Sequence, residues 1–339
     1  MSVQSPSHAK AGTISVRIDA IVDETPDIRA FRLVRSDGEP FDRFEPGAHV
    51  DVLIPDAPVR QYSLFGDPGD RTAYWFAVKK ERASRGGSLA LHERVQVGDE
   101  IRIGAPRNLF RLQPEAARHI LIAAGIGITP LLSMAHHLLA RDDTARQDFT
   151  LHYFVRSEPE GAFIPLLREA PFARHVQIHA GIGRERLDDA LNVLLADVPA
   201  SAQVYTCGPA GFMEAVVEAA ARHLPADHVH LERFGVEQAS GAHELATEGA
   251  ASAFDVVLGS SGQRVNVPAG TTIVEALATV GIEIDTSCGE GICGTCIVDV
   301  VQGEPDHRDH CLSKAEKAGN QVICCCVSRA RSAELVLDL

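Results

Sequence analysis

The chain has 339 residues, of which 45% are hydrophobic, and a formal net charge of −14 from 32 basic and 46 acidic residues. This length exceeds what one ordinary core organises, so two or three domains are expected. The acidic balance argues against nucleic acid and anionic membranes as partners, and it suits a basic docking surface on another protein.

Targeting signals are not visible in the sequence. There is no run of about eighteen apolar residues, and the opening MSVQSPSHAKAG lacks the apolar segment of a signal peptide. Residues 1–12 are expected to form an N-terminal tail. The eight cysteines fit a reducing compartment better than a disulfide framework. We therefore expect a cytoplasmic protein without membrane contact.

Residues 13–112 show short alternating segments separated by glycine, proline and other turn residues. This pattern predicts a small antiparallel β-barrel. The expected strands are Ile14 to Val22, Ile28 to Val34, His49 to Ile54, Arg60 to Leu64, Ala73 to Lys79 and Glu100 to Gly104.

Two short strings in this barrel point to a ligand when they are taken together. The string RQYS places Arg60, Tyr62 and Ser63 on one strand, and SRGGS (84–88) precedes a helical stretch. A glycine pair before a helix N-terminus is a ready anion site. Each string alone is also typical of an ordinary strand or a capped helix. Their order favours a site for a flavin ring and its phosphate.

Residues 113–235 alternate apolar runs with helical ones, which predicts a nucleotide-binding α/β domain with a parallel sheet. The first strand ends in GIGITP, where Gly125 and Gly127 permit close backbone approach and Thr129 lies at the start of a helix. A later strand ends in YTCGPAG, at the sheet edge where ligands of such folds bind. Either loop alone is as often structural, and Cys207 is as often a core residue. Together they favour a bound nicotinamide nucleotide.

Residues 236–252 are small and polar without apolar periodicity, which predicts a linker. Residues 253–339 then follow a strand, strand, helix, loop, strand order typical of a β-grasp fold. The division into 1–12, 13–112, 113–235, 236–252 and 253–339 meets no competing repeat or low-complexity segment.

The string CGEGICGTC carries the most specific chemistry in the chain. It places Cys288, Cys293 and Cys296 at plant-type ferredoxin spacing, and a run of three cysteines, 324–326, follows. Four such thiolates hold a [2Fe-2S] cluster. A structural zinc is the alternative, but zinc sites usually pair their ligands as two CxxC knuckles.

The fourth ligand is open among the three adjacent cysteines. Strand alternation would send Cys324 and Cys326 to one face and Cys325 to the other. We favour Cys326, which begins the string CVSRA. Cys324, Cys325 and Cys311 are then expected to be packing or surface residues.

With these residues in hand, the chain resembles the phthalate dioxygenase reductase family, the class IA reductases that supply electrons to Rieske-type oxygenases. The resemblance covers nearly the whole chain and its domain order. The strings that carry it are RQYS, SRGGS, GIGITP, YTCGP, HLERFG, CGEGICGTC, GEPDHRD and CVSRA.

The resemblance implies three cofactor sites. It implies FMN on the barrel, with Ser63 near the flavin N5 and Phe234 of HLERFG against the flavin face, and NADH with Cys207 near the nicotinamide C4. It places the ligands of a [2Fe-2S] cluster at Cys288, Cys293, Cys296 and Cys326. The flavin residues are Arg60, Gln61, Tyr62, Ser63, Arg85, Gly86, Gly87 and Ser88, and the nucleotide residues are Gly125, Gly127, Thr129, Cys207, Gly208 and Pro209.

The resemblance also implies a function, which is electron transfer from NADH through FMN and the cluster to a Rieske-type oxygenase that acts on aromatic rings or removes O-methyl groups. Ser63 and Cys207 would orient the reacting rings without reacting themselves. A monomer is expected, since the protein must dock and leave. The alternatives are a reductase of another acceptor, such as a ferredoxin or a haem protein, and a redox sensor without turnover.

Overall fold

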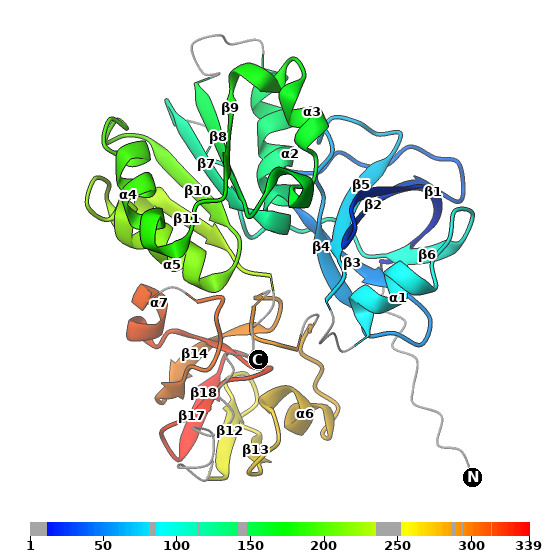
Figure 1. Cartoon of the computed structure of the whole chain (residues 1–339). Helices are drawn as coiled ribbons and strands as arrows, with labels where there is room; N and C mark the ends of the chain where they lie inside the picture. Colours follow the sequence, from blue (N-terminus) through cyan, green and yellow to red (C-terminus); the bar gives the residue numbers. More distant parts are fainter. Residues whose placement is uncertain are drawn as a thin grey trace. The chain divides into compact units, whose positions relative to one another are not determined.

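The computed structural model describes residues 12–81, 86–113, 116–141, 148–234, 252–286, 289–292, 294–312 and 314–339. The chain divides into two compact units, residues 1–232 and residues 233–339. Figure 1 shows the barrel and the parallel sheet of the first unit, in blue to yellow-green, and the sheet of the second unit, in yellow to red. The expected tail and the expected linker (236–252) fall almost entirely outside the described residues.

The barrel is a six-stranded antiparallel sheet in the order β4-β3-β6-β1-β2-β5. An antiparallel bridge between Leu64 and Phe76 joins its two edge strands, and the Phe65 N–H donates to the Trp75 carbonyl at 3.0 Å. This closure removes exposed sheet edges. The elements are β1 (Ile14–Thr25), β2 (Ile28–Arg35), β3 (His49–Leu53), β4 (Arg60–Ser63), β5 (Tyr74–Lys79), α1 (Gly87–Glu93) and β6 (Glu100–Ile103).

The second part of the first unit is a five-stranded parallel sheet in the order β11-β10-β7-β8-β9. Its strands are β7 (His119–Ala124), β8 (Phe149–Val155), β9 (Val176–Ala180), β10 (Gln203–Cys207) and β11 (Val229–Glu232). Its helices are α2 (Ile128–Leu139), α3 (Ile164–Arg168), α4 (Arg184–Leu195) and α5 (Ala210–Ala220), with the 3-10 turns η1 (Gly125–Gly127), η3 (Glu158–Glu160), η4 (Phe172–Arg174) and η5 (Ala226–His228).

Strand alternation gives this sheet two apolar faces. Leu121 of β7 packs in a core with α2 and α3, whereas its neighbour Ile122 packs in a second core with α4 and α5. The first core also contains Ile28 and Phe65 of the barrel. Barrel and parallel sheet therefore share buried apolar surface, which fixes the barrel beside the carboxyl ends of the sheet strands.

The short edge strand β11 was not among the expected strands. Its sequence, VHLE, is only four residues long and every residue in it is half-buried. A strand of this length with polar residues carries no clear apolar periodicity. The tertiary structure orders it through parallel pairing with β10, in which Cys207 lies opposite Glu232.

The second unit has a five-stranded mixed sheet in the order β13-β12-β18-β14-β16, in which β12 and β18 are parallel. A capping box formed by Thr272 and Glu275 starts helix α6. The elements are β12 (Phe254–Leu258), β13 (Arg264–Val267), α6 (Ile273–Ala278), β14 (Ile297–Gln302), β15 (Pro305–Asp306), α7 (Lys314–Gly319), β16 (Val322–Cys324), β17 (Arg329–Ala330) and β18 (Glu334–Leu337).

The architecture confirms the expected fold class of antiparallel barrel, parallel α/β sheet and ferredoxin-like sheet. Helix α7 and the short strands β15 and β17 are additions that the sequence patterns did not indicate, and strand β16 ends at Cys324, at the start of the cysteine run where a strand was expected. In the described part of the chain, no helix combines the length and apolar character needed to cross a membrane.

Candidate electron-transfer sites

A hydrogen bond joins the barrel to the parallel sheet at the expected flavin site. The Ser63 hydroxyl, at the end of β4, donates to Glu232 Oε2 of β11 at 3.1 Å. Both groups are shielded from water, with Ser63 4% exposed and the Glu232 side chain 14% exposed. The bond therefore links the strand that is expected to face the flavin with the edge strand of the nucleotide domain.

Burial changes the protonation of this carboxyl group. It raises the pKa of Glu232 from 4.5 to about 8, against the opposing effect of the Ser63 hydrogen bond. Glu232 therefore carries a proton near neutral pH. His49 Nδ1 lies 4.0 Å from Glu232 Oε1, but burial, assisted by the nearby Arg107, lowers the pKa of His49 to about 4. The pair is consequently neutral and is not an ion pair.

Cys207 lies at the same junction. It ends β10 opposite Glu232 in the parallel register and is fully buried. Burial, and then the neighbouring Glu232, raise the pKa of the Cys207 thiol. The thiol therefore stays protonated, which fits a packing or orienting group better than a nucleophile.

The start of α1 forms the described part of the expected phosphate loop. Gly86 has a φ of 107°, and a Cβ on Gly87 would lie 2.5 Å from Arg60 Cγ. The arginine stem thus rests directly on the first turn of the helix, as a shared anion site requires. Ser88 accepts a hydrogen bond from the Glu81 N–H at 3.3 Å. Arg85 lies outside the described residues.

The remaining residues of RQYS have separate surroundings. Tyr62 stacks on Phe76, with ring centroids 5.2 Å apart and an interplanar angle of 23°, and burial raises the pKa of its hydroxyl. Gln61 instead donates to Asp51 Oδ1 at 3.3 Å. Strand alternation thus directs Tyr62 and Gln61 to opposite faces, and the described contact of Gln61 is with the barrel itself.

The two expected nucleotide loops meet at one glycine. A Cβ on Gly127 would lie 2.3 Å from the Cys207 carbonyl oxygen and 2.7 Å from Gly208 N. A Cβ on Gly208 would in turn lie 2.9 Å from Ala124 Cβ. The turn after β7 and the turn after β10 therefore pack backbone to backbone, which only glycine allows.

Other residues of these loops support the turns. Gly125 has a φ of 56° and opens the turn η1, and Pro209 precedes helix α5 as its N-cap. Thr129 is 2% exposed, and its hydroxyl donates to the Ile126 carbonyl at 3.2 Å. Its described role is thus to hold the turn, and its place beside a nucleotide stays a prediction.

Phe234 follows β11 at the start of the second unit, and 41% of its surface is exposed. Such exposure is unusual for phenylalanine. The predicted contact between Phe234 and the flavin face stays a prediction.

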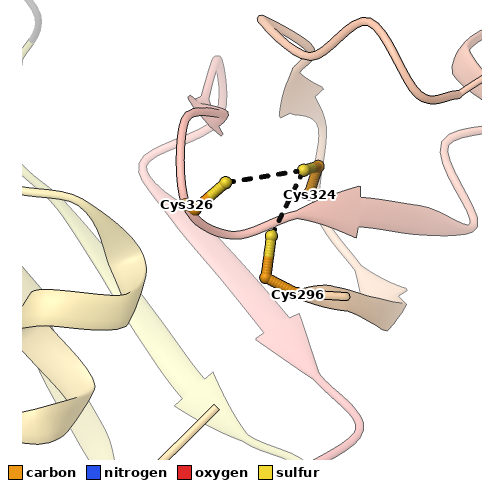
Figure 2. A group of neighbouring side chains, drawn as sticks. All are labelled: Cys296, Cys324 and Cys326. Atoms are coloured by element: carbon orange, nitrogen blue, oxygen red, sulfur yellow. Dashed lines mark hydrogen bonds between the residues drawn. The ribbon is translucent and has the colours of Figure 1, made fainter. Parts of the chain in front are cut away.

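Three thiols gather in the second unit, as Figure 2 shows. The sulfur atoms of Cys296, Cys324 and Cys326 all lie within 4.8 Å of one another, and all three residues are buried. Cys324 Sγ is 3.3 Å from Cys296 Sγ and 3.9 Å from Cys326 Sγ. Cys288 and Cys293 lie outside the described residues, so the ligand assignment stays a prediction.

Cys324 is completely buried in the core of this unit, which is compatible with the expected packing role. Its thiol also lies between two cysteines that were predicted to be ligands. Contacts with Cys296, and then with Cys311 and Cys326, raise the pKa of the Cys324 thiol in the absence of a metal. The close thiols fit a thiolate-ligated metal group, because metal binding removes the protons that otherwise crowd such a site.

Glycines of the cysteine loop adopt the backbone conformation that a tight wrap requires. Gly289, Gly291 and Gly294 have φ values of 66°, 71° and 69°. At Gly291 a Cβ would also lie 2.5 Å from Val327 Cγ2 and 3.0 Å from Asp309 Cα. The loop is therefore pressed against the segment that follows the third cysteine of the 324–326 run.

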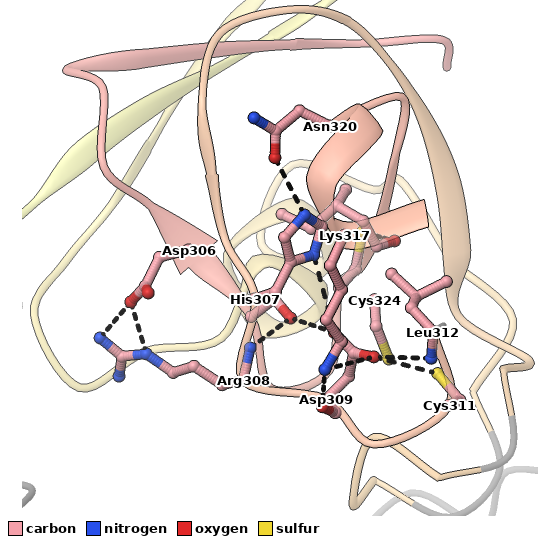
Figure 3. Close-up of polar contacts among 12 residues, drawn as sticks. Asp306, His307, Arg308, Asp309, Cys311, Leu312, Lys317, Asn320 and Cys324 are labelled. Carbon is pink, nitrogen blue, oxygen red and sulfur yellow. Dashed lines mark hydrogen bonds and ion pairs between the residues drawn. The ribbon is translucent and has the colours of Figure 1, made fainter. Parts of the chain in front are cut away.

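Figure 3 shows polar contacts around Asp309, the last residue of the GEPDHRD string, which was used above only for the resemblance. The Asp309 side chain is completely buried and accepts hydrogen bonds from the Leu312 N–H at 2.9 Å and the Ser328 hydroxyl at 3.3 Å. Lys317 Nζ lies 3.6 Å from its Oδ2. The adjacent His310 N–H donates to the Gly291 carbonyl at 2.7 Å. Asp309 thus anchors a segment that binds the cysteine loop directly.

Family models match two parts of the chain. Residues 256–331 match the 2Fe-2S iron-sulfur cluster binding domain. Residues 100–228 match the N-terminal domain of the DmmA-like subunit of dimethylamine monooxygenase.

Curated relatives align with almost the entire chain. A vanillate O-demethylase oxidoreductase of Pseudomonas sp. strain HR199 is 44% identical over 96% of this chain and 100% of its own length. The carnitine monooxygenase reductase subunit of Escherichia coli K12 is 39% identical over 96% of this chain and 98% of its own length.

Solved structures also align with almost the entire chain. Phthalate dioxygenase reductase, described as a modular structure for electron transfer from pyridine nucleotides to [2Fe-2S], aligns with a TM-score of 0.71 and 35% identity over 97% of this chain and 98% of its own. A self-sufficient cytochrome P-450 monooxygenase aligns with a TM-score of 0.80 and 36% identity over 99% of this chain, which spans 43% of that longer protein. The chain therefore belongs to the phthalate dioxygenase reductase family and is an oxidoreductase that uses a flavin, a pyridine nucleotide and a [2Fe-2S] cluster.

Proposed function

We propose that this protein takes hydride from NADH, passes the electrons through FMN and its [2Fe-2S] cluster, and delivers them to a Rieske-type oxygenase. The observation that carries the proposal is the junction of Ser63, Cys207 and Glu232, where the barrel meets the carboxyl ends of β10 and β11. Ligands of open α/β sheets bind at this edge. A flavin on the barrel would therefore face a nicotinamide at the sheet.

The bound flavin would supply the conversion between a two-electron donor and a one-electron cluster. The contribution of the protein is to hold the flavin and nicotinamide rings in position for the reaction. Ser63 is held by Glu232 at 3.1 Å, so its oxygen has a fixed position at the ring edge. The protonated Glu232 adds no charge beside the reacting rings. Cys207, which is fully buried, limits how deeply a nicotinamide can enter.

The phosphate of FMN would bind where Arg60 rests on the start of α1, with Gly86, Gly87 and Ser88. Backbone N–H groups and a guanidinium are suitable donors for a phosphate. The cluster would be held by Cys288, Cys293, Cys296 and one cysteine of the 324–326 run. The gathered thiols and the positive φ values of the loop glycines support this assignment.

We propose NADH as the substrate instead of NADPH because negatively charged side chains follow strand β8. Glu158 and Glu160 follow this strand on the turn η3, and the Ser157 hydroxyl donates to Glu160 Oε1 at 2.8 Å. Carboxylates suit the 2'-hydroxyl of NADH and repel the 2'-phosphate of NADPH. The ratio of kcat/KM for the two nucleotides tests this choice, and equal values would contradict it.

The proposed partner is the oxygenase component of a ring-hydroxylating or O-demethylating system, and the proposed state is a cytoplasmic monomer. The vanillate O-demethylase and carnitine monooxygenase reductases among the relatives support an oxygenase partner. The test is reconstitution of the chain with NADH and a purified vanillate O-demethylase oxygenase component. Product formation that requires this chain is expected, and NADH oxidation without any electron transfer to Rieske oxygenases would contradict the proposal.

A haem protein is the second candidate acceptor. It is favoured by the alignment of 99% of this chain with 43% of a longer chain, that of a self-sufficient cytochrome P-450 monooxygenase. Reduction of a purified bacterial cytochrome P-450 at rates well above those for a Rieske oxygenase would favour this candidate. The reverse order would favour the oxygenase.

A further inference from the structure

Cys324 is buried in the core of the second unit, and its sulfur also lies close to the sulfurs of two predicted cluster ligands. Its sulfur lies 3.3 Å from that of Cys296 and 3.9 Å from that of Cys326 (Figure 2). Two thiolates on one tetrahedral metal with bonds of about 2.3 Å lie about 3.8 Å apart. Cys324 is thus near ligand spacing from both cysteines that were predicted to bind iron.

The other cysteines of this unit have different surroundings. Cys325 Sγ lies 3.9 Å from the Ile323 carbonyl oxygen and is not among the gathered thiols. Cys311 Sγ contacts Asp309 Oδ2 at 3.6 Å. Of the cysteines in the described residues, only Cys324 joins Cys296 and Cys326 in the group with ligand spacing.

The backbone explains why two cysteines share one position. Strand β16 ends at Cys324, and the chain turns at once through 325–327. The Cys325 N–H donates to the Cys296 carbonyl at 3.1 Å, and the Ser328 N–H donates to the Cys324 carbonyl at 3.0 Å. These bonds hold the turn against Cys296, so the thiols before and after Cys325 face the same space.

We propose that Cys324 and Cys326 are interchangeable ligands of the cluster, either of which completes the set with Cys288, Cys293 and Cys296. The proposal rests on the cluster ligation proposed above. In the exchange, the bond from iron to Cys326 sulfur breaks and a bond to Cys324 sulfur forms, while the Cys324 thiol proton passes to Cys326. No electron is gained or lost. The second cysteine thus keeps the cluster bound when the first is lost.

The test compares four alanine variants of the full chain, C324A, C325A, C326A and C324A/C326A. Alanine is used because a serine oxygen can itself bind iron. Iron and acid-labile sulfide per chain are measured after anaerobic reconstitution with ferrous iron and sulfide. The electron paramagnetic resonance spectrum is recorded after dithionite reduction. Reconstitution ensures that a failure of assembly in the cell does not decide the result.

Each single variant is expected to keep more than about half of the wild-type iron, whereas the double variant should keep less than about a tenth. C326A should show a shifted resonance spectrum, because a different cysteine binds the iron. C325A should match the wild type.

Loss of the cluster in C326A alone, or in C324A alone, would overturn the proposal, and so would a double variant that keeps its iron. Wild-type protein without iron after reconstitution would instead refute the cluster ligation itself. C296A is the control for complete loss.

Discussion

Glu232 holds the Ser63 side chain at the proposed flavin site, although no sequence pattern singles it out. It lies in a short half-buried strand, and its importance comes from the Ser63 hydroxyl 3.1 Å away. The two residues are far apart in the chain, so local patterns cannot reveal their contact. Ser63 belongs to the string RQYS and Glu232 to the string HLERFG, but only the folded structure shows that the two side chains are in contact.

Replacing Ser63 by alanine removes the hydroxyl at the junction. The rate of flavin reduction by NADH in Ser63→Ala should fall at least about tenfold, because ring placement is lost. The absorbance of the cluster should stay unchanged. Stopped-flow spectroscopy measures both, with the exposed Ser36→Ala as the matched control. An unchanged rate of flavin reduction would contradict the role of Ser63.

The raised pKa of Glu232 predicts a pH dependence of stability. The folded chain holds this proton up to about pH 8, whereas the unfolded chain loses it near 4.5. The unfolded state therefore binds fewer protons in this window, and stability falls as pH rises through it. Glu232→Gln removes this contribution.

Thermal melts at several pH values test this prediction. Between pH 5 and pH 8 the wild-type melting temperature should drop more than that of Glu232→Gln. Parallel curves for the two proteins would show that Glu232 ionises normally.

At the scale of elements, the contact between the turns after β7 and β10 shapes the proposed nucleotide site. A Cβ on Gly127 would meet the Cys207 backbone at 2.3 Å, and backbone cannot move aside as a side chain can. Gly127→Ala should therefore raise the KM for NADH and destabilise the protein by about 1–3 kcal/mol.

Gly211→Ala on α5 is the matched control, because a Cβ there meets nothing within 4 Å. It should leave KM and stability near wild type. If Gly127→Ala behaved like this control in steady-state kinetics and denaturant unfolding, the close approach of the two turns would be wrong.

The segment around Asp309 is the second element on which a site depends. Asp309→Ala leaves the Leu312 N–H and the Ser328 hydroxyl without their acceptor and should destabilise the second unit by about 2–3 kcal/mol. It should also lower the iron content, because this segment binds the cysteine loop through Gly291. Flavin reduction should stay normal. Asp306→Ala, whose side chain is 26% exposed, is the control.

The sequence patterns anticipated elements better than contacts. The six barrel strands begin within one residue of their expected starts, because alternation and turn residues are local signals. Strands β11, β15 and β17 were missed because they are ordered by their pairing partners. Strand alternation placed Cys324 and Cys326 on one face, in agreement with the 3.9 Å between their sulfur atoms. The distance of Cys324 from Cys296 depends on the turn at 325–327, which no periodicity encodes.

At the scale of the whole molecule, the residues proposed for different cofactors lie in different units. The proposed flavin and nucleotide residues, apart from Phe234, lie in the first unit, and the three gathered thiols lie in the second. Cys293→Ala should therefore lose the cluster while NADH still reduces the flavin. Iron analysis and anaerobic absorption spectra measure the two properties separately. An intact cluster spectrum would refute Cys293 as a ligand.

The most direct test of the account is an anaerobic titration of the purified protein with NADH, followed by absorbance and by electron paramagnetic resonance. FMN takes two electrons and a [2Fe-2S] cluster takes one, so complete reduction should require about one and a half equivalents of NADH per chain. The flavin bands should bleach, and the resonance of a reduced cluster should appear. Bleaching that is complete at one equivalent without a cluster signal, or a colourless protein that contains zinc, would contradict the proposed electron path.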